Sequence, residues 1–375
     1  MKRAMPVAAA LCTLTISALL AGCGGNDNSN GGPRIVATIA VPNSTSPPFS
    51  FDIGYVDSGK YYLADRSNAA VDVVDTKSNT LVAQIKGNFT GIGASTDTSG
   101  PDGLVGIPGT NTLYAGDVNA VKVLDVGTQQ LVKTIPISTS GSRVDEGCYD
   151  PDDGLVMFSS PGESPPFATF ISTKTQTVVA KLTFKDSSGL EACVYDPKGK
   201  NFIVNNDGTT ANPDGEVNVI PAATVVAGAP AVMHVFPLGK CAPTGLDLGP
   251  NNDMIVGCDP APGDPLITLI LDRTTGATLA TIPFGGVDQI AYDSVSNRYF
   301  LPARHYQTNN IAAASNFVPT LAIVDAASRT ILTTLAIGNN AHSVAVDGAT
   351  GQAYLPFAPG VAAFPNGGIQ VVSTH

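Results

Sequence analysis

The stretch VDVVDTKSNTLVAQI, which begins at Val71, decides the fold, because related stretches return about every fifty residues. The other copies are VKVLDVGTQQLVKTI from Val121, ATFISTKTQTVVAKL from Ala168, LILDRTTGATLATI from Leu269 and LAIVDAASRTILTTL from Leu321. Each copy is two runs of alternating residues around a turn that begins at Asp75, Asp125, Ser172, Asp272 or Asp325. These short polar side chains are expected to bond the backbone two residues on, which predicts a β-hairpin in every copy.

A second hairpin precedes the repeated one, as in YVDSGKYYLAD from Tyr55 and CVYDPKGKNFIV from Cys193. One period therefore holds four short strands, which is a propeller blade. The inner-hairpin turns lie at Asp57, Ile107, Asp150, Asp196, Gly249, Asp293 and Asp347, and they predict seven blades. The last blade lacks an outer strand, but RIVATIAV from Arg34 matches the missing pattern. We therefore predict an all-β, seven-bladed β-propeller over residues 34–375, with little helix and an N-terminal strand that closes the last blade.

The first residues of the chain have the form of an export signal. Lys2 and Arg3 precede an apolar run that ends in LLAGC, which looks like the lipoprotein box of bacteria. Residues 1–23 are then a signal peptide and lipobox, Cys23 carries lipid, and residues 24–33 form a flexible tether. Gly24 favours the outer membrane by resemblance to other lipoproteins, so we expect a periplasmic or cell-surface protein held to the membrane by its N-terminal lipid. A plain secretory peptide with a nearby cysteine is the alternative.

Charge excludes one class of partner. The chain has 20 Lys and Arg against 31 Asp and Glu, so nucleic acid is not an expected partner. An acidic surface suits cationic or metal ligands, and it also suits simple solubility.

Four cysteines follow the lipidation site, and this even number fits an oxidising compartment. Cys241 and Cys258 flank the inner hairpin of the fifth blade, which predicts a disulfide across its open end. Cys148 and Cys193 lie on inner strands of neighbouring blades with opposite side-chain parity. This second pair either meets between the sheets as a disulfide or points apart, and a metal site is the sharper alternative.

An acidic ring is the strongest functional signal. Five residues before each inner turn, which we call the ring position, stand Asp52, Asp102, Asp145, Glu191, Thr244, Asp288 and His342. Innermost strands line the channel of a propeller, so these side chains are expected at one mouth. Clustered carboxylates repel unless they are protonated, hydrogen-bonded or bridged by a cation. We therefore predict a divalent cation, Ca²⁺ or Mg²⁺, held by Asp52, Asp102, Asp145, Glu191 and Asp288; the alternative is a set of local backbone caps or a water-filled funnel.

The long irregular insertions of the sequence are expected to follow second strands, which places them around the same mouth. Candidate ligand-binding residues in these connections are Asp65, Arg66, Asn206, Arg304 and Tyr306. The expected partner at this loop-rich face is a protein, a polysaccharide or a small molecule, bound by a monomer.

The repeat resembles the YVTN (YncE-like) family of bacterial β-propellers, whose repeat has the form LYVTN, then VSVIDT, then VVATI. The matching segments are YYLADRSNAAVDVVDTKSNTLVAQI from Tyr61 and TLYAGDVNAVKVLDVGTQQLVKTI from Thr112, and LADR and YAGD replace the YVTN tetrad. The resemblance implies a binding propeller or, more distantly, a metal-dependent hydrolase, lactonase or lyase. For the enzyme alternative, His342 and His305 are the candidate general acids or bases.

Lipid attachment can be tested directly. In a bacterial host, the wild-type chain is expected in the membrane fraction, and Cys23→Ser is expected to move it to the soluble fraction because the acyl anchor is lost. Fractionation with mass spectrometry of the mature N-terminus measures both. A wild-type protein released without lipid would contradict the lipobox interpretation.

Overall fold

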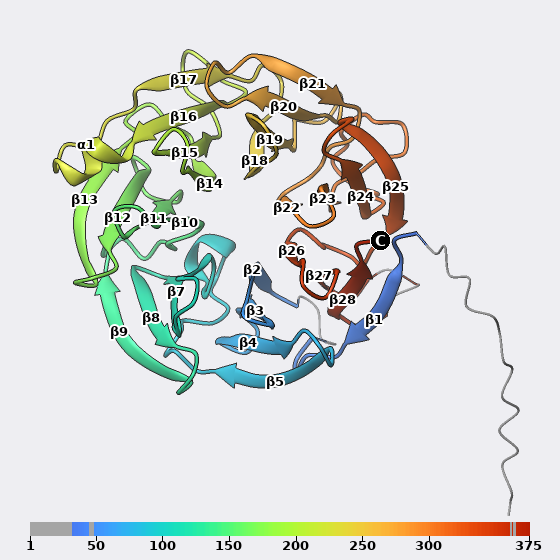
Figure 1. Cartoon of the computed structure of the whole chain (residues 1–375), viewed down its shortest axis with the longest axis horizontal. Coiled ribbons are helices and arrows are strands. Elements are labelled where there is room, and N and C mark those ends of the chain that lie inside the picture. Colours follow the sequence, from blue (N-terminus) through green and yellow to red (C-terminus); the bar gives the residue numbers. More distant parts are fainter. Residues whose placement is uncertain (1–31, 45–48, 361, 363–364) are drawn as a thin grey trace, which may run out of the picture. The chain divides into compact units, whose positions relative to one another are not determined.

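The computed structural model describes residues 32–44, 49–360, 362 and 365–375. Seven four-stranded antiparallel sheets stand in a ring around a central axis (Figure 1), which confirms the seven-bladed β-propeller. The described helices are short: the α-helix α1 (Ala222–Val226) and the 3₁₀ helix η1 (Thr96–Thr98). No helix within the described ranges has the length and apolar character needed to cross a membrane. The predicted signal peptide and Cys23 lie outside the described residues.

Each blade runs outward from the channel in chain order. Blade 1 is β2 (Phe51–Asp57), β3 (Lys60–Asp65), β4 (Ala70–Asp75) and β5 (Thr80–Ile85). Blade 2 is β6 (Leu104–Gly106), β7 (Thr112–Asp117), β8 (Ala120–Asp125) and β9 (Gln130–Pro136). Blade 3 is β10 (Gly147–Asp150), β11 (Leu155–Ser160), β12 (Phe167–Ser172) and β13 (Thr177–Thr183).

The remaining blades follow the same plan. Blade 4 is β14 (Leu190–Asp196), β15 (Asn201–Asn206), β16 (Glu216–Pro221) and β17 (His234–Pro237). Blade 5 is β18 (Pro243–Leu248), β19 (Asp253–Cys258), β20 (Thr268–Asp272) and β21 (Thr278–Ile282). Blade 6 is β22 (Ala291–Asp293), β23 (Arg298–Ala303), β24 (Thr320–Asp325) and β25 (Thr330–Ala336). Blade 7 is β26 (Ala345–Asp347), β27 (Gln352–Phe357), β28 (Gly368–Ser373) and β1 (Ile35–Ile39).

The repeated turns form by the predicted chemistry, although most of the side-chain bonds reach one residue further along the backbone than expected. The Asp75 carboxylate accepts the N–H of Ser78 at 2.9 Å and Asp325 that of Ser328 at 2.7 Å, each three residues on. Asp272 also makes the expected bond, because it accepts the N–H of Thr274, two residues on, at 2.9 Å. The last residue of the turn then adopts the left-handed conformation, as Asn79 does at φ 53°. Blade 4 replaces this turn with α1, which explains why the repeat cannot be recognised there.

The core lies between neighbouring blades. Second strands are buried along their length, and large rings fill the gaps between sheets; Phe170 of blade 3 meets Phe202 of blade 4 at a centroid distance of 5.2 Å. Every blade therefore depends on both neighbours for burial of its apolar faces.

The N-terminal strand closes the ring as predicted. Strand β1 pairs antiparallel with β28, with Ile39 opposite Ile369 and Ala37 opposite Val371. Ile39 is buried in the cluster that joins blade 7 to blade 1. The closure hides the edge that β28 would otherwise expose.

Both predicted disulfides are present. Cys241 bonds Cys258 across the open end of the inner hairpin of blade 5, with 4.7 Å between the Cα atoms. Cys148 bonds Cys193 and joins β10 to β14, with a Cα separation of 5.7 Å, so the opposite parity makes the two side chains meet between blades. Two disulfides fit an oxidising compartment.

Closure predicts an asymmetric response to deletion. Removing residues 34–40 takes away β1 and is expected to cost at least about 3 kcal/mol of unfolding free energy, because buried aliphatic side chains are lost and the edge of β28 is exposed. Removing residues 25–31 is the control of equal length, with little expected effect. Thermal denaturation and light scattering measure both, and equal tolerance of the two deletions would refute closure.

Candidate functional site

A cavity of about 480 Å³ opens at the mouth where the inner strands begin. Ring-position side chains from five blades line it: Asp52, Asp145, Glu191, Asp288 and His342. Asp102 lies buried in contact with Arg66, which itself lines the cavity. Thr244 instead donates its hydroxyl to the carbonyl of Val287 at 2.5 Å. The predicted convergence of ring positions therefore holds for most blades.

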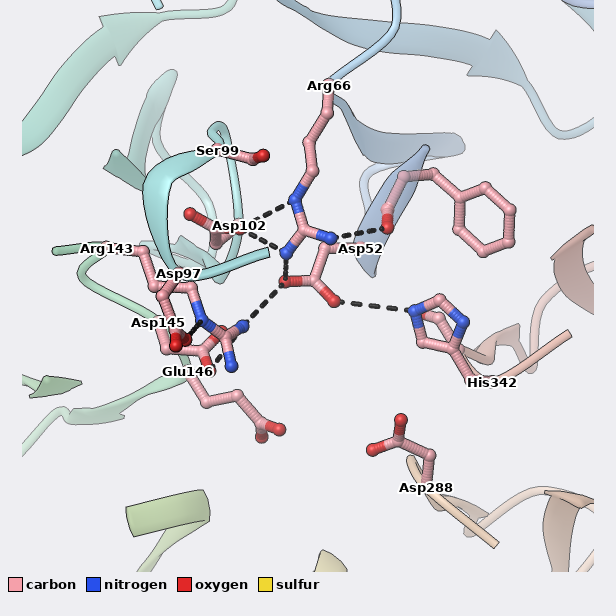
Figure 2. Close-up of polar contacts among 12 residues, drawn as sticks. Asp52, Arg66, Asp97, Ser99, Asp102, Arg143, Asp145, Glu146, Asp288 and His342 are labelled. Carbon is pink, nitrogen blue, oxygen red and sulfur yellow. Dashed lines mark hydrogen bonds and ion pairs between the residues drawn. The ribbon is translucent and has the colours of Figure 1, made fainter. Parts of the chain in front are cut away.

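Arg66 enters this mouth as a buried counter-ion (Figure 2). Its Nη2 lies 2.5 Å from Asp52 Oδ2, and both Nε, at 2.8 Å, and Nη2 donate to Asp102 Oδ1. Burial opposes ionisation of Asp52, but Arg66, a hydrogen bond with His342 and Arg143 together lower the pKa of this carboxyl. Burial raises the pKa of Asp102 well above its ordinary value despite Arg66. Arg66 thus brings positive charge to these two aspartates, whose candidate ligand atoms lie within 4.8 Å of each other and of one of Asp145; metal binding by these three residues stays a prediction.

A second arginine, the partly buried Arg143, escaped the sequence analysis. Its Nη1 lies 2.7 Å from Asp145 Oδ2 and 3.7 Å from Asp52 Oδ2. Its Nε donates to Asp97 Oδ1 at 3.3 Å, and its backbone N–H donates to the Asp97 carbonyl at 2.7 Å. Burial nevertheless raises the pKa of Asp145 to about 7. A signal for Arg143 existed, because a residue two positions before a ring position shares its side of an extended chain.

Asp97 belongs to a long connection that does not follow a second strand, contrary to the expectation from the sequence. Residues 86–103 join outer strand β5 to β6, and residues 92–96 and Ser99 line the cavity. The expectation that every long insertion leaves a second strand was therefore wrong. An inner strand is entered on the same face that a second strand leaves, so both kinds of connection reach this mouth.

A second group of carboxylates lies across the cavity. Candidate ligand atoms of Glu146, Glu191 and Asp288 all lie within 4.8 Å of one another. Arg304 Nη1 pairs with Asp288 Oδ2 at 2.8 Å, and Gln289 Nε2 donates to Glu146 Oε1 at 2.5 Å. Burial, then repulsion from Glu191, raises the pKa of Glu146 well above its ordinary value. Glu146 was missed because we counted one ring residue in each blade.

The pKa of Glu191 is also raised well above its ordinary value, by burial and then by repulsion from Asp207. Both shifts favour the protonated glutamates, and a bound cation would favour the ionised ones.

The two candidate histidines have different surroundings. His342 lines the cavity, stacks on Phe51 at a centroid distance of 4.8 Å, and has Nδ1 2.8 Å from the Asn340 carbonyl and Nε2 3.4 Å from Asp52 Oδ1. His305 follows the lining residue Arg304 and pairs with Asp259 at 2.7 Å, but His305 itself is not among the residues that line the cavity.

Of the five predicted ligand-binding residues, the structure brings Arg66 and Arg304 to the cavity. Asp65 accepts the Asn68 N–H at 3.0 Å, Asn206 donates to Asn218 at 3.1 Å, and Tyr306 stacks on Phe284 at 4.7 Å. Within the described ranges these last three do not contribute to the cavity wall. Their local contacts account for their positions, and ligand binding by them stays a prediction.

Comparisons with known proteins show similarity of fold. No family model and no curated protein sequence matches the chain. A solved chain of Kuenenia stuttgartiensis hydrazine synthase is similar, with 14% identity and a TM-score of 0.66 over 86% of this chain and 94% of that one. A chain of a mitotic checkpoint complex has 12% identity and a TM-score of 0.62 over 96% and 98%. The computationally designed Ika8 protein has 12% identity and a TM-score of 0.56 over 86% and 83%. At these identities the likeness is one of fold alone.

The buried carboxyl groups predict a pH dependence of stability. The pKa of Asp145 is about 7 in the folded chain, against about 3.9 in an unfolded one. The folded state therefore binds this proton more tightly, and the resulting stability is complete below pH 4 and lost as pH rises through 7.

Asp145→Asn, which is neutral at every pH, is expected to reduce the fall in unfolding free energy between pH 5 and pH 8 by about 2–4 kcal/mol. Urea denaturation at both pH values measures this difference. An unchanged pH dependence in the variant would show that Asp145 ionises normally in the folded chain.

Proposed function

We propose that this chain is a noncatalytic binding propeller that captures a ligand with anionic oxygen atoms at its acidic mouth through a divalent cation. The observation that carries the proposal is the group formed by Glu146, Glu191 and Asp288. It combines closely spaced carboxylates with an open cavity. Among the contacts described for these three residues, the one ion pair joins Asp288 to Arg304.

The spacing of these oxygens suits a hard cation. Ligand atoms that lie within 4.8 Å of one another can all reach an ion at the ~2.3–2.6 Å typical of Ca²⁺. An all-oxygen donor set favours Ca²⁺ or Mg²⁺ over Zn²⁺. Because such ions take about six to eight ligands, three carboxylates leave positions for water or for oxygen atoms of a bound ligand.

The other acidic group fits a cation less well. Asp52 and Asp102 share Arg66, and Asp145 pairs with Arg143, so guanidinium groups already neutralise that side of the mouth. We therefore place the ion among Glu146, Glu191 and Asp288, and assign Asp52, Asp102 and Asp145 to the support of the cavity wall.

A metal-dependent hydrolase or lactonase is the second candidate, because His342 lines the same cavity. Both ring nitrogens of His342 face oxygen acceptors, Asn340 O and Asp52 Oδ1. A general acid or base needs a nitrogen directed at the reacting group. This geometry favours ligand binding over catalysis.

The proposed setting is the outer membrane of a bacterium, with the propeller in the periplasm or at the cell surface. The LLAGC segment, the resemblance to YVTN propellers and the two disulfides support it. A polysaccharide, a protein or a small molecule with anionic oxygens would complete the coordination of the ion.

The experiment is calorimetric titration of the chelator-treated protein with CaCl₂ and MgCl₂ at pH 6 and pH 8. Saturable binding is expected, with higher affinity at pH 8, because the raised pKa values of Glu146 and Glu191 make protons compete with the ion. Glu146→Gln and Glu191→Gln are each expected to weaken binding by about tenfold or more.

Glu163→Gln is the matched control, since it makes the same chemical change at a partly exposed carboxylate outside the cavity, where Ser140 donates to Glu163 at 2.6 Å. Binding that survives in the double variant of Glu146 and Glu191 would place the ion elsewhere. If the wild-type protein gives no saturable heat with either salt, the proposed cation site is refuted.

A further inference from the structure

A second cavity, of about 410 Å³, lies at the opposite mouth of the channel. The inner strands begin at the acidic mouth and end here: on β2, Asp52 lines the first cavity and Tyr55 the second. Three residues of extended chain span about 10 Å, so the two cavities are separate sites.

The wall of this cavity is aromatic and apolar. It contains three tyrosines and three prolines from the ends of the inner strands and the turns that follow: Tyr55, Tyr149, Tyr195, Pro108, Pro151 and Pro197. Among the described residues that line it, none has a charged side chain. An ammonium group with N–H donors would find few acceptors in such a wall, whereas a group without donors needs none.

Carboxylates stand beside the tyrosines. Tyr195 donates its hydroxyl to Asp152 Oδ2 at 3.0 Å. The pKa of Tyr55 is raised by burial and then by the charge of Asp57, which places that carboxylate near the ring. The neighbourhood is therefore negative while the wall itself is apolar, and tyrosine faces add the negative side of their quadrupoles.

We propose that this second cavity binds a quaternary ammonium group. Such a cation carries its charge on methyl groups, so it packs against apolar walls, gains cation–π attraction from aromatic faces and requires no hydrogen-bond acceptor. The cavity offers tyrosine rings from blades 1, 3 and 4 for the methyl groups, and Asp57 and Asp152 supply long-range attraction.

Titration of the full chain with choline chloride tests the proposal. Saturable binding is expected, and the neutral isostere 3,3-dimethylbutan-1-ol is expected to bind at least about tenfold more weakly, because it has the same shape without the charge. Tyr149→Ala is expected to weaken choline binding about tenfold, and Tyr149→Phe, which keeps the ring, about threefold or less.

Tyr292 supplies the matched control. It holds the same place before its turn in blade 6 as Tyr149 does in blade 3, but its hydroxyl donates to Asn297 at 2.8 Å and its ring lies outside this cavity. Tyr292→Ala should leave choline affinity unchanged. Equal affinity for choline and its neutral isostere, equal loss in both alanine variants, or no saturable binding would each overturn the proposal.

Free solutes and lipid headgroups both carry quaternary ammonium groups, and a second arm separates them. If the protein pellets with phosphatidylcholine vesicles and free choline abolishes this pelleting, the cavity binds the quaternary ammonium group of a lipid headgroup. If the protein binds choline but does not pellet with the vesicles, the cavity binds the quaternary ammonium group of a free solute.

Discussion

One buried guanidinium, that of Arg66, holds the acidic mouth together. It pairs with Asp52 of blade 1 and with Asp102, which directly precedes blade 2, and both carboxylates are removed from solvent. Burial of several carboxyl groups in one place is costly unless positive charge accompanies them. Arg143 extends the same neutralisation to Asp145 and fastens the 86–103 connection over the cavity. This network holds the carboxyl groups of one side of the mouth, while Arg304 and Gln289 hold Asp288 and Glu146 on the other.

The fold was predictable because its determinants are local and repeated. A turn such as Asp75 to Asn79 encodes its own hairpin, and five similar copies outweigh the divergence of blade 4, where α1 interrupts the pattern. Ring positions were predictable for a related reason, since equivalent residues in equivalent blades reach one level. Arg143 and Glu146 were missed because they break that equivalence, and no single-blade pattern reports a charge supplied by a neighbouring blade.

The same logic explains why the two ends of the channel differ. An inner strand offers its first side chains to one face and its last to the other, so each strand contributes to two separate environments. Asp52 and Tyr55 show this on β2, where three residues separate a carboxylate at one mouth from an aromatic ring at the other. The strands thus place carboxyl groups on the loop-rich side and uncharged rings on the side with short turns.

The pairing of β1 with β28 also sets the order of events during folding. The Arg34 N–H donates to Ser373 Oγ across 339 positions of the sequence, so the first strand to be synthesised is among the last to find its partner. Contacts between residues so far apart in the sequence form late and slowly, because the intervening chain must already be compact. Until then β28 presents an unpaired edge, and the chain is open to association with other copies. Before that step the blades form an open ring, and the solubility of this intermediate depends on the rate of a single final docking step.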